Sequence, residues 1–166
     1  MVFDEYDVTF SGITNALGFE SAIGEIRVFG DYEAYKAEVL AQRQTRRGRQ
    51  NPFTIVRLSM PSPASAELHV VTRGSEEDFD TPALPEQTVT NPAFGKKLAF
   101  HAADARTVAL IPPEILNKLS VDSERLHLAV RGNVALYEIV GENTDANYWI
   151  NVIEFLGKIA DRVRKG

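Results

Sequence analysis

The side chains with the clearest chemical potential are three histidines on separate predicted strands. His69, His101 and His127 each sit in an alternating apolar–polar pattern, and none has the spacing of a zinc motif. Alternation places His69 and His127 on the strand side opposite their apolar neighbours, so the two could share one outer face of a sheet. With a carboxylate such as Glu67 they would support acid–base chemistry, and a hydrolase with such a spatially assembled site stays open as an alternative function. Strand histidines more commonly face solvent, so no catalytic residue is assigned.

Other motifs that would indicate catalysis are missing from the sequence. It contains no Gly-x-Ser-x-Gly elbow, no glycine-rich phosphate loop and no cysteine. The lack of cysteine excludes a thiolate metal site, a cysteine nucleophile and a disulfide scaffold together. We therefore expect neither a bound metal nor a cofactor, and the sequence leans away from an enzyme.

A basic run is the strongest charged feature of the chain. Its four arginines, predicted to lie on a polar loop over residues 43–50, are Arg43, Arg46, Arg47 and Arg49. They are candidates for binding phosphates or another anionic surface. The net charge of −5 and the lack of interleaved aromatic residues argue against nucleic-acid binding. The alternative interpretation is a solvated hairpin tip, or a tip that meets the acidic 76–78 loop of a neighbouring molecule.

The C-terminal stretch, residues 144–165, predicts an amphipathic helix. At about 100° per residue its apolar side chains gather on one broad face, while Gly157 and most of the charged residues occupy the other. Such a helix packs one face on a sheet. Tyr148, Trp149 and Ile153 are candidates to line a cavity between helix and sheet, although core packing is the favoured interpretation of Tyr148 and Trp149.

The remaining patterns predict the other elements of one α+β domain. Residues 1–20 show helical spacing, and residues 24–140 read as a series of short strands with turn signals. This sheet region contains an exposed loop over 74–91, a strand over 96–101 and a short helix over 112–119. Gly132-Asn133 marks the turn of a hairpin that leads directly into the C-terminal helix.

The segment from Asn91 to Leu119, NPAFGKKLAFHAADARTVALIPPEILNKL, resembles uncharacterised bacterial domains that often occur in membrane-associated proteins. In those domains a phenylalanine-bearing strand leads to a short turn from aspartate to arginine, then to a proline step and a small helix. A hairpin and a closing helix follow, as they do here. The resemblance implies a fold for the second half of the chain and no activity.

Together these patterns predict a curved, mainly antiparallel sheet with the C-terminal helix packed across one face. The expected function is a non-catalytic protein-binding or assembly module that acts through a protein partner or self-association. The alternative is a binder of small molecules or lipids in the cavity between sheet and helix. No apolar run approaches the ~18 residues of a membrane span, so we expect a cytoplasmic protein that could reach a membrane through a partner.

Overall fold

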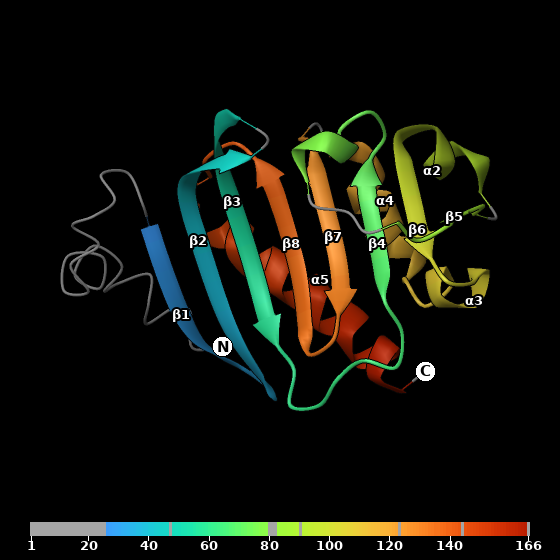
Figure 1. Ribbon diagram of the computed structural model, residues 1–166. Coiled ribbons are helices and arrows are strands. Elements are labelled where there is room, and N and C mark those ends of the chain that lie inside the picture. Colours follow the sequence, from blue (N-terminus) through green and yellow to red (C-terminus); the bar gives the residue numbers. More distant parts are fainter. Residues whose placement is uncertain are drawn as a thin grey trace.

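Eight strands form one open sheet in the computed structural model, which describes residues 26–46, 48–79, 83–89, 91–122, 124–143 and 145–165 (Figure 1). Every neighbouring pair is antiparallel, in the order β1-β2-β3-β8-β7-β4-β6-β5. The strands are β1 (Ile26–Tyr32), β2 (Tyr35–Arg46), β3 (Arg49–Ser59), β4 (Leu68–Thr72), β5 (Glu86–Gln87), β6 (Leu98–Ala102), β7 (Leu126–Arg131) and β8 (Val134–Val140). The predicted helix over residues 1–20 lies outside the described residues.

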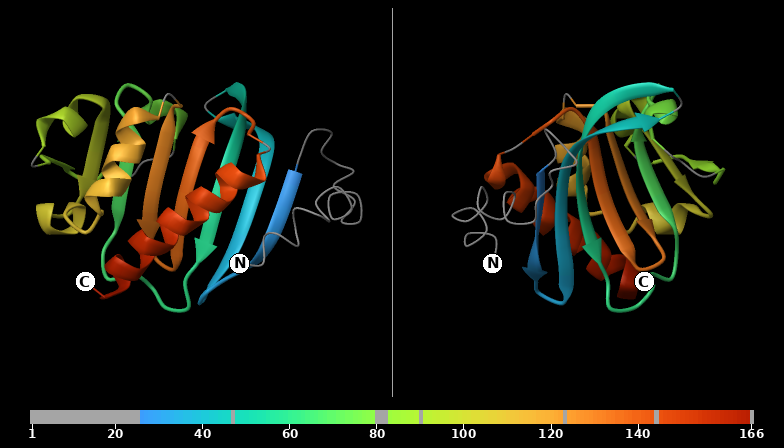
Figure 2. Two further views of the ribbon diagram at one scale, coloured as in Figure 1. Left: turned by 180° about the vertical axis from the view of Figure 1, so that it is seen from behind. Right: turned by 60° about the vertical axis from the view of Figure 1, so that its left-hand side comes forward.

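The helices lie at one edge of the sheet and across one of its faces. They are the 3-10 turn η2 (Glu76–Asp78) and the α-helices α2 (Pro92–Lys97), α3 (Ala105–Val108), α4 (Pro113–Val121) and α5 (Ala146–Lys165). Seen from behind, α5 runs diagonally across the sheet with α4 on the same side (Figure 2). The predicted fold class, an antiparallel sheet with a C-terminal helix across one face, is therefore confirmed.

Helix α5 and the sheet enclose the main core. Apolar side chains from seven strands meet those of α4 and α5 in one buried cluster, in which Leu58, Leu128, Ile153 and Leu156 are almost fully buried. Gly157, predicted on the polar side of the helix, is buried instead. A Cβ atom at this position would lie 2.8 Å from Cε1 of Tyr32, so glycine lets the Tyr32 ring pack directly on the helix.

Two local predictions need correction. Residues 43–50 were expected to form a polar loop, but β2 and β3 pair as far as Arg46 and Arg49, and the hairpin turns at Gly48 with a φ of 78°. Its tip is polar on both faces, so it lacks the alternation that identifies a strand. The strand expected over 96–101 begins only at Leu98, because helix α2 extends to Lys97. Asn91 caps the start of this helix by accepting a hydrogen bond from the backbone N–H of Ala93.

The register assigns side chains to the two faces of the sheet. We call the face opposite α5 the outer face. One cross-strand row on it runs through Glu38, Arg57, Leu136, Ala129 and His69. The next row runs through Ile55, Glu138, His127 and Val71. The tip of the β2–β3 hairpin bends over this face (Figure 2). The outer face is thus apolar in part, charged in part, and left uncovered by α5.

Candidate functional site

Two histidines meet on the outer face, as the strand patterns predicted. Nδ1 of His69 on β4 and Nε2 of His127 on β7 lie 2.9 Å apart. The ring planes differ by 9° and the centroids are 5.2 Å apart. Two rings with nitrogens 2.9 Å apart have centroids as far apart as 5.2 Å only when both nitrogens lie on the line between the centroids. The imidazoles therefore meet edge to edge and share a hydrogen bond.

In each histidine of the pair, the ring nitrogen that does not face the other ring lies within hydrogen-bond distance of a carboxylate. Nε2 of His69 lies 2.8 Å from Oε2 of Glu67, and Nδ1 of His127 lies 2.9 Å from Oε1 of Glu138. Arg46 donates from Nη2 to Oε2 of Glu138 at 2.9 Å. We call these five side chains the histidine network. The sequence suggested Glu67 as a partner but missed Glu138, which the register places opposite His127.

The network is buried although it faces away from the main core. His69 and His127 are 3% and 2% exposed. Phe79, which follows η2, lies against the His127 ring with centroids 5.5 Å apart and joins Phe53 in a second, smaller core cluster. Arg46 closes the same region, because its guanidinium lies 3.8 Å from the centroid of the Phe53 ring. The common expectation of solvent-facing strand histidines therefore does not hold here.

The pKa values of His69 and Glu138 are both lowered, but for different reasons. Burial lowers the pKa of His69, and the hydrogen bond to Glu67 only partly opposes it. Burial by itself would raise the pKa of Glu138, but the hydrogen bonds from His127 and Arg46 outweigh it and hold that pKa below its ordinary value. Glu138 is thus an ionised carboxylate at neutral pH.

The depressed pKa of Glu138 predicts a stability change in acid. A carboxyl with a lower pKa in the folded state stabilises the fold above its unfolded pKa of about 4.3, and this contribution is lost as pH falls through the folded value. We expect Glu138→Gln to be less stable than wild type at pH 6, with a difference that shrinks steadily towards pH 3. Urea unfolding across this range measures it, with exposed Glu114→Gln as control. A difference that does not depend on pH would contradict the assignment.

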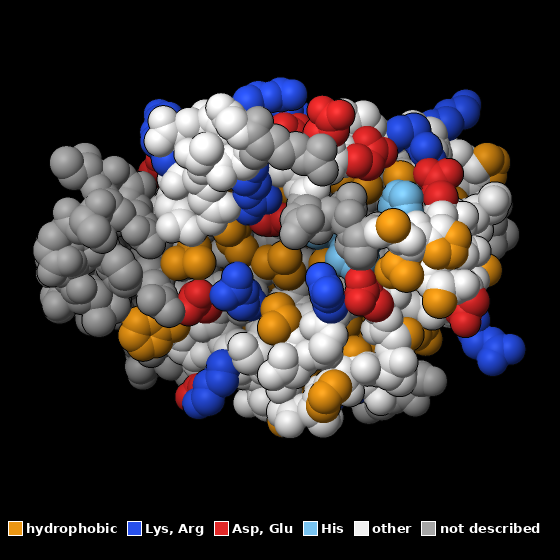
Figure 3. All heavy atoms as spheres, viewed as in Figure 1, with side chains coloured by type: hydrophobic (Ala, Val, Ile, Leu, Met, Phe, Trp, Pro, Cys, Tyr) orange, Lys and Arg blue, Asp and Glu red, His pale blue; other side chains and the backbone are white. Residues whose placement is uncertain are grey.

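Above the network lies an open hollow of about 430 Å³, which we call the arginine hollow. Its apolar floor includes Ile55, Leu136 and Ala129, and the small Ala129 side chain leaves room between its larger neighbours. Both network histidines line it, together with Glu138 and the three arginines Arg46, Arg57 and Arg131. Figure 3 shows basic side chains on either side of an apolar patch over the middle strands. Three guanidinium groups and one carboxylate line the hollow, and two further carboxylates, Glu38 and Glu67, pair with Arg57 and Arg131.

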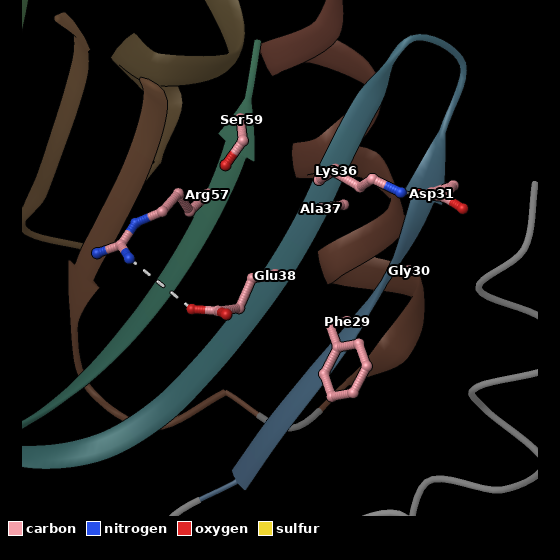
Figure 4. Close-up of a pocket in the computed structure, with 8 residues that line it drawn as sticks. All are labelled: Phe29, Gly30, Asp31, Lys36, Ala37, Glu38, Arg57 and Ser59. Carbon is pink, nitrogen blue, oxygen red and sulfur yellow. Dashed lines mark ion pairs between the residues drawn. The ribbon is translucent and has the colours of Figure 1, made fainter. Parts of the chain in front are cut away.

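A second hollow of about 440 Å³ adjoins the first over β1, β2 and β3 (Figure 4). Arg57 lines both, and its Nη1 lies 3.8 Å from Oε1 of Glu38. Lys36 pairs with Asp31 at 2.8 Å on the same floor. The second hollow is thus lined by two acidic and two basic groups, and one of the basic groups is the Arg57 that it shares with the arginine hollow.

The predicted cavity residues on α5 separate into core and surface. Trp149 and Ile153 are buried in the main core, and the Trp149 indole donates to the backbone oxygen of Asn143 at 2.8 Å. Tyr148 is half-buried and lines a smaller hollow of about 230 Å³ beside Tyr137 and Phe155. Burial raises the pKa of Tyr148 to about 12. Of the three candidates, Tyr148 lines this hollow, while Trp149 and Ile153 pack in the main core.

The candidate anion-binding arginines are also divided by the structure. Arg46 belongs to the histidine network, and it also donates to the backbone oxygen of Asp78 at 3.3 Å. Arg49 lies 3.8 Å from Glu77, so the hairpin tip meets the acidic 76–78 segment of its own chain. Arg43 is exposed on β2, and Arg47 lies outside the described residues. The sequence missed Arg57 and Arg131, because single arginines in strands look like ordinary surface residues.

Two further features bear on function. Among the described residues, no group of three or more His, Asp or Glu side chains has an arrangement that could hold a metal ion. No described helix combines the length and the apolar character required to cross a membrane.

Comparison with known proteins gives a fold relationship. No family model matches the sequence, and no curated protein matches it. The resemblance noted for residues 91–119 therefore stays a prediction. The crystal structure of the mycobacterial trehalose monomycolate transport factor A, TtfA, is similar with a TM-score of 0.57 and 9% identity, over 84% of this chain and 71% of that chain. At this identity the likeness shows a shared fold.

Proposed function

We propose that this protein is a non-catalytic binding module whose outer face binds an acidic segment of a partner protein. The observation that carries the proposal is the arginine hollow, where cationic side chains flank an apolar floor on the face that α5 leaves uncovered. Apolar contact supplies affinity, and the guanidinium groups select carboxylates through paired hydrogen bonds. A likeness in fold to a protein described as a transport factor is compatible with a role in binding.

Arg57 and Arg131 are the residues proposed to contact the partner. Their ion pairs within the chain are long, at 3.8 Å to Glu38 and 3.6 Å to Glu67. Their side chains are 44% and 70% exposed. Long, exposed ion pairs stabilise a protein little, so these guanidinium groups exchange partners at small cost. Arg46 differs, because close contacts to Gln44 and Glu138 fix its position.

The shape of the surface favours a chain segment over a small enclosed molecule. The arginine hollow and the hollow over β1–β3 both open to solvent and share Arg57, so a segment longer than either hollow would pass over this side chain from one to the other. An extended acidic segment lying in the arginine hollow would place its carboxylates between Arg57 and Arg131. Its apolar side chains would contact Leu136 and Ala129.

The histidine network supports binding rather than catalysis. Each of the four ring nitrogens of His69 and His127 lies within hydrogen-bond distance of another atom of the network. A general base needs a nitrogen within reach of the substrate proton, and each ring nitrogen here faces another atom of the network instead.

The test is binding of a short glutamate-rich peptide that carries a fluorescent label, measured by anisotropy at low salt. We expect wild type to bind and each of Arg57→Gln and Arg131→Gln to weaken binding by about tenfold, as expected for a lost hydrogen bond between charged groups. Arg162→Gln is the matched control, because it removes the same charge from an exposed position on α5. A lysine-rich peptide should not bind.

Two results would refute the proposal. One is failure of wild type to bind the acidic peptide at low salt. The other is binding that survives the Arg57→Gln/Arg131→Gln double substitution, because the peptide would then sit elsewhere.

A further inference from the structure

We propose that the arginine hollow takes up its acidic segment together with one proton, which the His69–His127 pair accepts. This inference rests on the proposed function. It adds a chemical property of the ligand. The segment must not only be acidic but must also place a carboxylate close to the imidazoles that line the hollow.

The argument begins with a count of protons. Three hydrogen bonds in series connect Glu67, His69, His127 and Glu138, with distances of 2.8, 2.9 and 2.9 Å. Each bond needs one proton between its two heavy atoms. Two neutral imidazoles bring two protons, and two ionised carboxylates bring none. The count does not depend on which tautomer either ring adopts, so the complete network holds one proton more than its neutral histidines supply.

Without the third proton, one link loses its hydrogen bond. Two acceptor atoms then face each other at less than 3 Å, either between the two rings or between a ring and its carboxylate. In a buried site an acceptor pair of this kind is unfavourable, because neither atom has water as a substitute partner. The network therefore has a vacant proton position whose occupancy depends on the charge nearby.

The charges around the histidine pair determine under which conditions it binds the third proton. The ionisable side chains that face the histidine pair are Glu67, His101, Arg131, Glu138, Arg46 and Arg57. Three are arginines, which disfavour a further positive charge. Burial also lowers the pKa of His69, which further disfavours the third proton in the protein without ligand.

An acidic segment in the hollow reverses this balance. Its carboxylate neutralises the arginines and lies over the two rings, so the charged form of the pair becomes favourable. By linkage, a ligand that promotes protonation must itself bind more tightly when the proton is available. Affinity should therefore rise as pH falls from 8 to 6.5, by up to about tenfold per pH unit where one full proton is taken up.

Isothermal titration calorimetry of the glutamate-rich peptide into wild-type protein tests this directly. At pH 7, binding enthalpies measured in HEPES and Tris, which differ in heat of ionisation and supply no phosphate to the arginines, should differ and indicate uptake of up to one proton per peptide. His69→Gln should bind the peptide with an enthalpy that no longer depends on the buffer. His101→Gln, the same substitution on the neighbouring strand β6, should retain the uptake.

The outcomes separate this inference from the proposed function. Binding with equal enthalpy in both buffers overturns the inference and leaves the proposed function standing. The same holds if His69→Gln folds, binds and still takes up the proton. Absence of peptide binding at every pH refutes the proposed function and the inference with it. The wild-type comparison needs no variant, so it decides even if His69→Gln fails to fold.

Discussion

Arg46→Ala should destabilise the protein by about 3 kcal/mol at neutral pH, the lower end of the cost of breaking a buried ion pair. The substitution leaves the carboxylate of Glu138, whose side chain is only 6% exposed, without its guanidinium partner. It also removes the cation that covers the Phe53 ring and the contact to the backbone of Asp78. Denaturant unfolding followed by circular dichroism measures the change in the free energy of unfolding.

The control for Arg46 lies on the same strand. Arg43→Ala removes the same side chain from an exposed position of β2, and we expect a change below about 0.5 kcal/mol. Equal effects of the two substitutions would mean that the histidine network contributes little to folding. A double-mutant cycle of Arg46→Ala with Glu138→Gln should give a clear coupling energy, because both residues belong to one buried network.

Ile153→Ala should also destabilise the fold by about 3 kcal/mol, as expected for a large-to-small substitution in a packed core. Ile153 is fully buried between α5 and the sheet. Ile150→Ala makes the same chemical change at a half-buried position of the same helix and should cost less than half as much. Thermal unfolding of both variants provides the comparison.

This pair of substitutions also decides between two roles for the residue. If Ile153 lined a ligand cavity, its truncation would cost little stability and would alter ligand binding instead. A change below about 1 kcal/mol, well under the usual cost for a core isoleucine, would favour the cavity and contradict the core assignment.

The sequence predicted the elements whose periodicity is strong. The β7–β8 hairpin, helix α4 and helix α5 follow from alternating or helical apolar patterns with turn and proline signals at their ends. The shared face of His69 and His127 followed from the same alternation, since a strand has only two sides. Their direct contact could not be predicted, because it requires β4 and β7 to be neighbours although more than fifty residues separate them.

The rest of the site depends on long-range packing that no local pattern records. Glu138 becomes a network residue only through its register opposite His127. Arg46 reaches it because the polar tip of the hairpin bends over the outer face. Phe79 buries the pair from a segment that looks like an exposed acidic loop in the sequence. Each of these residues has an unremarkable local context, so only the assembled sheet reveals its role.

The division of the sheet into two faces links the fold to the proposed function. Helix α5 closes one face with the main core, while the described residues of the outer face form the small cluster around Phe53 and Phe79. That cluster fixes the histidine network beside the arginine hollow without covering it. A partner segment would thus meet a preformed surface, which limits the ordering cost of binding.

The most direct test of the binding surface is a titration of ¹⁵N-labelled protein with the glutamate-rich peptide, followed by NMR. We predict that the amide shifts cluster on β3, β7 and β8 around Arg57, Arg131 and Leu136, while those of α5 stay unchanged. Shifts confined to α5 or to the α2–α4 region, or no shifts at all, would contradict the account.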